Sequence, residues 1–300
     1  MNFFWDLFLG GITRGSIYAL IALGYTMVYG ILELINFAHG EIYMIGAFTA
    51  LIAASILTMQ GLTGISVLLL AMLIAVLYSS AYGYSVEKIA YKPLRRAPRL
   101  SPLISAIGMS IFLQNYVMLA QTSDFLPFPD LLMDVELPEA IAEWIAPSEF
   151  MIVVSAAVLM ICLTLVLKFT KMGKAMRAVA QDREMAMLLG INVNRIISRT
   201  FIIGSALAAI GGVLIGSHVG RINFYIGFAA GIKAFTAAVL GGIGSIPGAM
   251  LGGLVLGLTE SFATGYVSSD YENVFAFALL VLILIFKPEG LLGRSSQQKV

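Results

Sequence analysis

One apolar run constrains this chain more than any other feature: residues 42–86 contain no Asp, Glu, Lys, Arg or His. An α-helix rises about 1.5 Å per residue and the hydrocarbon core of a bilayer is about 30 Å thick, so this run is too long for one span. A Gly-rich turn at residues 60–64 divides it. The run therefore predicts two membrane-spanning helices joined by a tight turn.

Further apolar segments continue this pattern. The chain is 59% hydrophobic and 12% charged, whereas a soluble chain carries about 25% charged residues. The segments are continuously apolar, unlike the alternating strands of a membrane barrel. We therefore predict one domain over residues 1–300, an all-α polytopic membrane bundle of about eight (8–9) transmembrane segments with discontinuous or re-entrant elements. Besides 42–86, the predicted spans are 15–32, 100–123, 150–167, 200–217, 234–259 and 273–286.

Charged residues gather in loops of opposite sign. Residues 87–99, 168–199 and the tail from 287 hold all but three of the 18 Lys and Arg residues. Residues 121–149 carry seven acids and no Lys or Arg, and residues 260–272 carry three acids and no base. Because cytoplasmic loops are enriched in Lys and Arg, we predict that the basic loops and the C-terminus are cytoplasmic and the acidic loops external.

Two arrangements of the N-terminus stay open. If residues 231–264 cross the membrane twice, there are nine crossings and the N-terminus lies outside. If residues 218–247 form a re-entrant loop, or residues 31–41 bend back within the membrane, about eight crossings place it inside. The single cysteine, Cys162, lies in an apolar run and is predicted to be a buried, inert thiol.

A polar cluster separates the first two apolar runs: Glu33, Asn36, His39 and Glu41. On a helix, Glu33, Asn36 and His39 would share one face. Polar groups at membrane depth are unfavourable and usually line a cavity or pathway, so these residues are candidates for a substrate path. A short, hydrated cytoplasmic turn is the alternative. One imidazole among acids is not the ligand set of a metal site, and no metal is predicted.

Glycines dominate the C-terminal third of the chain. Spacing of four residues between small side chains lets helix backbones approach closely. A helix broken at residues 241–248 would also expose backbone groups that can bind a polar solute. Lys233, Gly241, Gly242 and Gly244 are therefore further pathway candidates, although Lys233 could instead extend to an interface. The pairs with packing spacing are Gly212 and Gly216, Gly227 and Gly231, Gly248 and Gly252, and Gly253 and Gly257.

The basic segment 171–199 is too long for a turn. Ala, Met, Arg, Glu and Leu favour a helix in its middle, with Gly190 placed to end it and Asn194 to cap the next helix. Met185, Leu188 and Leu189 recur at helical spacing. This apolar face predicts either an interfacial helix lying on lipid or a docking helix for a cytoplasmic partner.

Motifs for catalysis are missing from the sequence. It contains no G-x-x-x-x-G-K-[ST] loop for ATP and no G-x-S-x-G nucleophile motif. The net charge of +1 gives no indication of nucleic-acid binding. The chain is therefore predicted not to be an enzyme and to bind no cofactor.

As a set, several runs closely resemble the LivH-type permease subunits of bacterial high-affinity branched-chain amino acid ABC importers. The similarity extends from about residue 10 to residue 293, and the acidic loop 121–149 is its least similar part. The runs are Tyr-Ala-Leu-Ile-Ala-Leu-Gly-Tyr-Thr-Met-Val-Tyr-Gly at 18–30, Ile-Asn-Phe-Ala-His-Gly-Glu at 35–41, Ser-Ala-Ile-Gly-Met-Ser-Ile-Phe-Leu-Gln-Asn-Tyr at 105–116, the Gly-rich run at 233–249, and Leu-Leu-Gly-Ile-Asn at 188–192.

This resemblance implies partners and a location. Such a permease pairs with a second homologous permease in the bacterial inner membrane. Two cytoplasmic ATPase subunits, which use ATP and Mg, dock on it, and an external binding protein delivers Leu, Ile or Val. No nucleic acid is involved. The preferred cargo, and whether the permease pair is identical or mixed, stay open.

The resemblance also implies functional residues. Asn36, His39, Gln114 and Asn115, with the 241–248 backbone, are candidates to hold the zwitterionic ends of an amino acid. Residues 175–192 resemble the loop that contacts an ATPase, which agrees with their interpretation as a docking helix. The docking residues are Ala180, Asp182, Met185, Leu188, Leu189, Gly190, Ile191 and Asn192.

Three other functions stay open at this point. A permease of the same family could carry urea, short amides or other amino acids. An ion-coupled secondary transporter would be expected to hold paired intramembrane acids and to need no ATPase, so the docking-like loop argues against it. An intramembrane enzyme is disfavoured because no catalytic constellation is present.

Overall fold

The computed structural model describes residues 3–95, 97–98, 100–129, 131, 138, 142 and 144–293. Eight of its helices are long and apolar enough to cross a membrane, and α10 (Ile226–Gly241) is a shorter apolar helix. The predicted all-α membrane bundle is thereby confirmed. Some charged residues of the predicted loops lie outside the described residues: Arg96, Arg99, Arg294, Lys299, Asp130, Asp134, Glu136, Glu139 and Glu143.

The remaining elements follow in chain order. They are α1 (Phe3–Leu32), α2 (His39–Met59), α3 (Ile65–Val86), η1 (Glu87–Tyr91), η2 (Lys92–Leu94), α4 (Leu100–Ala120), β1 (Leu126–Pro127), α6 (Pro147–Phe169), α7 (Lys171–Gln181), α8 (Arg183–Leu188), α9 (Val193–Val219), β2 (Arg221–Ile222), α11 (Ile246–Tyr266), η3 (Ser269–Tyr271) and α12 (Glu272–Phe286).

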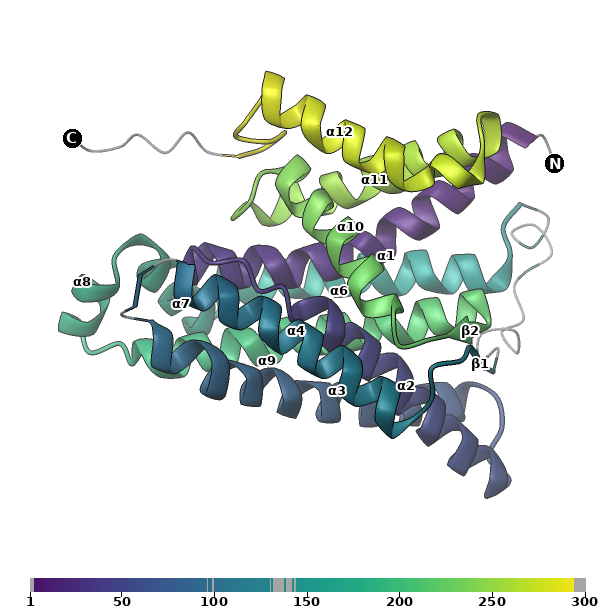
Figure 1. The fold of residues 1–300 in the computed structure, drawn as a ribbon, viewed down its shortest axis with the longest axis horizontal. Helices are drawn as coiled ribbons and strands as arrows, with labels where there is room; N and C mark the ends of the chain where they lie inside the picture. The colour runs from purple at the N-terminus through teal and green to yellow at the C-terminus, as the bar shows by residue number, and fades with distance from the viewer. Residues whose placement is uncertain are drawn as a thin grey trace.

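The two ends of the bundle are distinct (Figure 1). One end carries α7 and α8, and the other carries the antiparallel pair β1–β2, in which Leu126 lies opposite Ile222. The Phe3 ring contacts that of Tyr266, 5.6 Å between centroids, so α1 begins beside the end of α11. After α12, the backbone N–H of Leu291 donates to the carbonyl of Leu240, at 2.8 Å, at the end of α10.

The described chain therefore begins at the β1–β2 end and finishes at the α7–α8 end. An odd number of passes through the bundle is required. Between β2 and α12 the chain passes along the bundle through the short, oblique α10 and then back through α11 (Figure 1). Of the two arrangements left open by the sequence, this corresponds to the one with nine passes.

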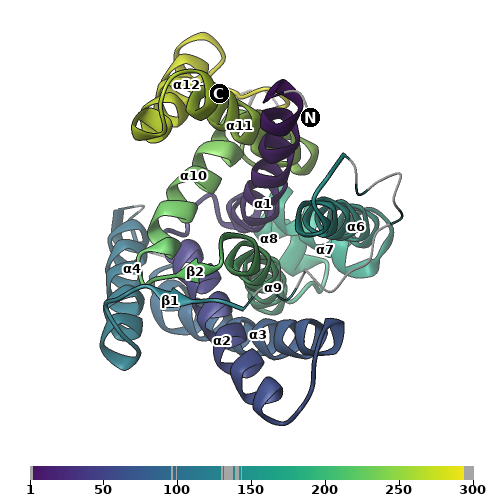
Figure 2. The same ribbon diagram turned by 90° about the vertical axis from the view of Figure 1, so that its right-hand side faces the viewer.

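Helices α1 and α9 form the centre of the bundle, with the other helices arranged around them (Figure 2). Close backbone approach makes this packing possible. A Cβ added to Gly253 of α11 would lie 2.6 Å from Cα of Ala19 in α1, and one added to Gly46 of α2 would lie 2.6 Å from Cα of Ala209 in α9. These contacts leave no room for larger side chains, as small-residue packing between membrane helices requires.

Peripheral helices present the apolar surface that a bilayer would cover. Leu77 of α3, Phe112 of α4, Ile161 of α6 and Ile285 of α12 are all more than half exposed. Since apolar surface on this scale is unfavourable in water, the outer helices are suited to contact lipid.

Several sequence predictions change in detail. Helix α9 starts seven residues before the predicted 200–217 span, capped by the side chain of Asn192, which accepts from Arg195 N–H at 3.0 Å. The prediction that Asn194 caps this helix is therefore wrong. Cys162 is exposed on the outer face of α6, so its predicted burial is also wrong. An apolar side chain on an outer helix can face either lipid or the protein core. Hydropathy does not distinguish these two environments.

Candidate functional site

The chain is not helical between α1 and α2. Residues 33–38 form an irregular break that starts at Glu33, with φ +54°, and α2 begins within the bundle: the imidazole of His39 lies against Gly24 of α1 and Gly204 of α9. Asn36, His39 and Glu41 are buried and Glu33 is exposed. The expectation that Glu33, Asn36 and His39 share one helical face is wrong, because no helix spans them.

Three buried polar side chains lie at the break, Asn36 within it and His39 and Glu41 in the first turn of α2, and each contacts a side chain from another element. Tyr91 donates from its hydroxyl to Asn36 Oδ1 at 2.8 Å, and Ser110 donates to Glu41 Oε1 at 3.0 Å. The ring of His39 meets that of Tyr25 edge-on, with 4.9 Å between centroids. Tyr91, Ser110 and Tyr25 come from three different helical elements, so the break is held from several sides.

One polar atom of each of these side chains has no hydrogen-bond partner in the protein. They are Asn36 Nδ2, His39 Nε2 and Glu41 Oε2. An unsatisfied buried polar group is unfavourable by about 1–3 kcal/mol. The break therefore concentrates unsatisfied polarity in the middle of the bundle, which is what a polar solute passing through it would need.

A small pocket of about 130 Å³ lies next to the break, between α4 and α10. Its lining includes Ser110 and Gln114 of α4, Gly227 and Gly231 of α10, and Tyr25 of α1. Gln114 and Glu41 thus lie in the same region, because Ser110 lines the pocket with Gln114 and also donates a hydrogen bond to Glu41. Asn115 is exposed, does not line this pocket, and donates from its amide to Ile111 O of its own helix at 2.8 Å.

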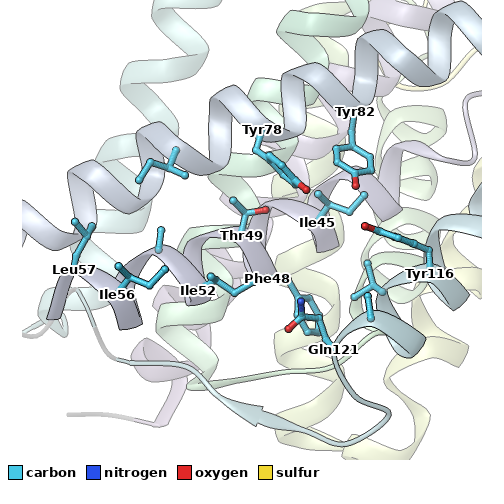
Figure 3. Close-up of a pocket in the computed structure, with 14 residues that line it drawn as sticks. Ile45, Phe48, Thr49, Ile52, Ile56, Leu57, Tyr78, Tyr82, Tyr116 and Gln121 are labelled. Carbon is cyan, nitrogen blue, oxygen red and sulfur yellow. The ribbon is translucent and has the colours of Figure 1, made fainter. Parts of the chain in front are cut away.

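A second, larger pocket of about 420 Å³ lies between α2, α3 and α4. Its walls are mostly apolar, and Figure 3 shows the hydroxyls of Tyr78, Tyr82 and Tyr116 turned toward one another. It contains none of the residues that the sequence predicts to contact substrate.

Lys233 points away from the break. Its ammonium group pairs with Glu272 of α12 and lies 3.2 Å from Glu260 Oε1 of α11, while Tyr18 donates to Glu260 Oε2 at 2.7 Å. These contacts join α1, α10, α11 and α12 in one ion-pair network. Lys233 and Glu260 are both visible in the sequence, but their pairing depends on how α10 packs on α11.

The Gly-rich break is shorter than the predicted 241–248. Gly241 still ends α10, α11 begins at Ile246, and Gly242 and Gly244 have φ of +101° and +92°. Gly241 packs on Gly248, and the carbonyl of Gly241 accepts a hydrogen bond from Leu292 N–H at 2.9 Å. This turn lies at the α7–α8 end of the bundle, so the structure does not bring its three candidate glycines together with Glu41.

The predicted docking segment consists of two helices. Asp182 separates them and caps α8, accepting from the N–H groups of Glu184 and Met185 at 2.9 Å each. Gly190 has φ +80° and ends the segment. Met176, Val179 and Ala186 are buried beneath it.

The outer surface of the segment is exposed. Leu188 is 82% and Leu189 is 73% exposed, and Met185 is about half exposed. Ala180, Asp182, Gly190 and Asn192 are also exposed, and Ile191 is half-buried. The residues assigned to docking thus form a surface with a strong apolar component at one end of the bundle.

Three contacts near this segment were missed at the sequence level. Arg183 Nη2 donates to Ile31 O at 2.6 Å, which ties α8 to the end of α1. The buried carboxylate of Glu87 pairs with Arg95 and accepts from Ser198 Oγ at 2.7 Å. Burial lowers the pKa of Arg95, and Glu87 opposes this shift. In the sequence, both arginines count only as loop charges, so nothing singles them out.

Metal binding finds no support in the described part of the chain, where no three His, Cys, Asp or Glu side chains are grouped to hold an ion.

Comparison with known proteins gives near full-length matches. The family described as "Branched-chain amino acid transport system / permease component" matches residues 7–284. The permease protein LivH of the high-affinity branched-chain amino acid transport system of Escherichia coli (strain K12) is 50% identical over 302 residues, covering 99% of this chain and 98% of LivH. BraD of Pseudomonas aeruginosa, a permease protein of the same kind of system, is 53% identical over 296 residues, covering 97% and 96%.

More distant matches cover less of the chain. The fructose import permease protein FrcC of Rhizobium meliloti is 31% identical over 135 residues, 43% of this chain and 37% of FrcC. No solved structure gives a significant match.

Proposed function

This chain belongs to the family of permease components of branched-chain amino acid transport systems, and we propose that it is the membrane-spanning subunit of an ABC importer for leucine, isoleucine and valine. The observation that carries the proposal is identity of 50% or more, over nearly the whole chain, to two permeases of such systems. FrcC, whose name gives another cargo, is similar over less than half of the chain.

The orientation follows from charge. The α7–α8 end carries the basic segment 168–199 and the end of α12, whereas the β1–β2 end carries residues 121–129, the described start of the acidic loop. Under the positive-inside rule, α7, α8 and the C-terminus lie in the cytoplasm and the start of α1 lies outside. The location proposed is the bacterial inner membrane.

Partner subunits supply the energy. We assign no ATP site to this chain, and ATP and Mg would be used by two ATPase subunits docked on α7 and α8. The exposed Leu188 and Leu189 support this assignment, because large apolar side chains on a cytoplasmic surface favour burial against a protein. A second homologous permease would complete the path, and an external binding protein would deliver the amino acid.

The mechanism needs the docking segment to communicate with the interior. Arg183 of α8 binds the carbonyl of Ile31, two residues before the break that starts at Glu33. Movement of the ATPases would shift α8 and, through this bond, the end of α1. ATP and the loaded binding protein can drive such a change only by binding one state of the permease more tightly than the other.

The test is uptake of radiolabelled leucine into proteoliposomes that contain this chain, its candidate second permease and the ATPases. Uptake should require both internal ATP and external binding protein. Uptake by this chain alone, driven by an ion gradient, would contradict the proposal and support a secondary transporter. Uptake of urea or a short amide in place of leucine would correct the cargo.

A further inference from the structure

We propose that the pocket between α4 and α10 is the site that holds the amino acid inside the membrane, with the substrate ammonium group at Ser110, backed by Glu41. The branched side chain of the substrate lies against Ile107, Phe228 and Ile232. This inference rests on the function proposed above and adds the part of the path at which the cargo is recognised.

A buried carboxyl group, that of Glu41, lies behind the floor of the pocket. Ser110 and Gly227 both line the pocket, and Glu41 lies directly behind them. Ser110 Oγ is 3.0 Å from Glu41 Oε1, and a Cβ added to Gly227 would lie 2.5 Å from Glu41 Oε2. The Glu41 residue is 0% exposed, and its Oε2 atom has no hydrogen-bond partner in the protein. A carboxyl oxygen without a protein partner therefore lies directly behind this wall.

The serine hydroxyl can connect the substrate to this carboxylate. A hydroxyl donates one hydrogen bond and accepts up to two. Ser110 already donates to Glu41, so its free lone pairs can accept from an ammonium group in the pocket. A positive ammonium group one hydroxyl away from Glu41 would also stabilise the ionised form of this carboxyl group at membrane depth.

The other walls match the apolar part of the substrate. Ile107 and Ile111 of α4 face Phe228 and Ile232 of α10, with Phe37 from the break. The pocket measures about 130 Å³. A cavity of about 150 Å³ lined by Leu, Ile and Phe side chains is large enough for benzene. The apolar part of the substrate, a side chain of three or four carbons, is smaller than benzene, whereas a benzyl side chain is larger than benzene. The ammonium and carboxylate groups lie outside this apolar part, at Ser110 and toward the open side of the pocket.

The open side of the pocket faces away from the centre of the bundle. Ile107, Ile111 and Phe228 are partly exposed there, and half-buried Gln114 places an amide beside them. An amide facing hydrocarbon would be unfavourable, whereas one facing a path between two permeases can donate to the substrate carboxylate. The α4–α10 face is therefore the one turned toward the second permease.

Cysteine labelling tests the position of the site. In a Cys162→Ser background, Gln114→Cys is compared with Asn115→Cys, its neighbour at the same depth on α4, which does not line the pocket. A small aqueous thiol reagent should modify Gln114→Cys at least tenfold faster, and millimolar leucine should slow that reaction and leave Asn115→Cys unchanged. Equal rates, or protection of Asn115→Cys alone, would overturn the proposal.

Substitution of the floor tests the chemistry. In the complete transporter, Glu41→Gln and Ser110→Ala should each raise the leucine concentration needed for half-protection of Gln114→Cys at least tenfold. Phe228→Ala should enlarge the pocket, so that phenylalanine, which does not protect the parent protein, protects the variant. Unchanged leucine protection in both floor variants would refute the site.

The uptake assay distinguishes failure of the proposed site from failure of the proposed importer function. If the Cys162→Ser protein takes up leucine with ATP and binding protein but Gln114→Cys is never protected, the importer assignment stands and the site is wrong. If the protein takes up no leucine under any condition, the importer assignment itself fails.

Discussion

The break between α1 and α2 and the α7–α8 segment are both interruptions between long helices, and they have opposite chemistry. At the break, Asn36, His39 and Glu41 place polar atoms in the protein interior. In the α7–α8 segment, Leu188 and Leu189 place apolar side chains in solvent. Each arrangement is unfavourable for an isolated chain. The two regions therefore need different ligands: a small polar molecule inside and an apolar protein surface outside.

The largest effect is expected from reversing the chemistry of the docking surface. Leu188→Asp combined with Leu189→Asp should abolish co-purification of the ATPases, because two charges would be buried in the interface without partners. Both side chains are exposed in the permease, so its insertion and thermal stability should not change. Gln181→Asp, also on the exposed surface of this segment, is the control and should keep the ATPases. Retained binding in the double variant would contradict the docking assignment.

At the break, a single methyl group should be enough to disturb the packing. A Cβ on Gly40 would overlap the carbonyl of Gly227 and lie 2.9 Å from Cα of Gly231. Gly40→Ala should therefore destabilise the protein by about 1–3 kcal/mol, as overpacking does. Thermal unfolding in detergent measures this.

The matched control is Gly108→Ala on α4. Nothing lies within 4 Å of a Cβ at Gly108, so the added methyl group has room. The control should leave the unfolding temperature unchanged or raise it slightly, since alanine favours helix more than glycine does. Equal destabilisation by both variants would show that the α2–α10 contact is not specially tight.

Much of the fold could be predicted from hydropathy and charge. Each predicted apolar run falls on helical residues of the bundle, although 234–259 covers the end of α10 and the start of α11 and not one helix. One glycine pair predicted to pack does so on α1, where Gly253 meets Ala19 and Gly257 meets Gly15. These features depend on local composition and spacing. Such properties are fully recorded in the sequence.

The candidate site could be predicted only in part. Asn36, His39 and Glu41 are conspicuous because they interrupt an apolar stretch, but the depth of His39 depends on the chain turning back beside Gly24 after the end of α1. Ser110 is an ordinary residue in an apolar helix until Glu41 is placed beside it. Because the two residues are 69 positions apart, the sequence around either of them does not indicate that they pair.

A smaller effect is expected from removing one hydrogen bond at the break. Tyr91→Phe deletes the hydroxyl that donates to Asn36 Oδ1 and leaves that oxygen buried. The free energy of unfolding should fall by about 1–3 kcal/mol or less, because the Asn36 side chain already has one polar atom without a partner. The variant should unfold at a lower temperature and still bind the ATPases. Loss of ATPase binding would mean that the two regions are not separable.

The smallest effect concerns the contact that joins the two regions. Arg183→Ala removes the hydrogen bond from α8 to the carbonyl of Ile31 at the end of α1. A single hydrogen bond contributes about 0.5–1.5 kcal/mol, which corresponds to about a twofold to tenfold change in an equilibrium. The ATPases should still co-purify and hydrolyse ATP, while leucine uptake per ATP should fall within that range.

Arg177→Ala separates coupling from local folding. Arg177 also binds main-chain carbonyls, but they belong to Leu167 and Lys168 at the end of α6, so its loss leaves the α8–α1 contact intact. Uptake per ATP should therefore stay near that of the parent protein. If Arg177→Ala lowers the ratio as much as Arg183→Ala does, the effect is a general loosening of the segment. If Arg183→Ala alone lowers it, the motion that ATP drives reaches the break through the end of α1.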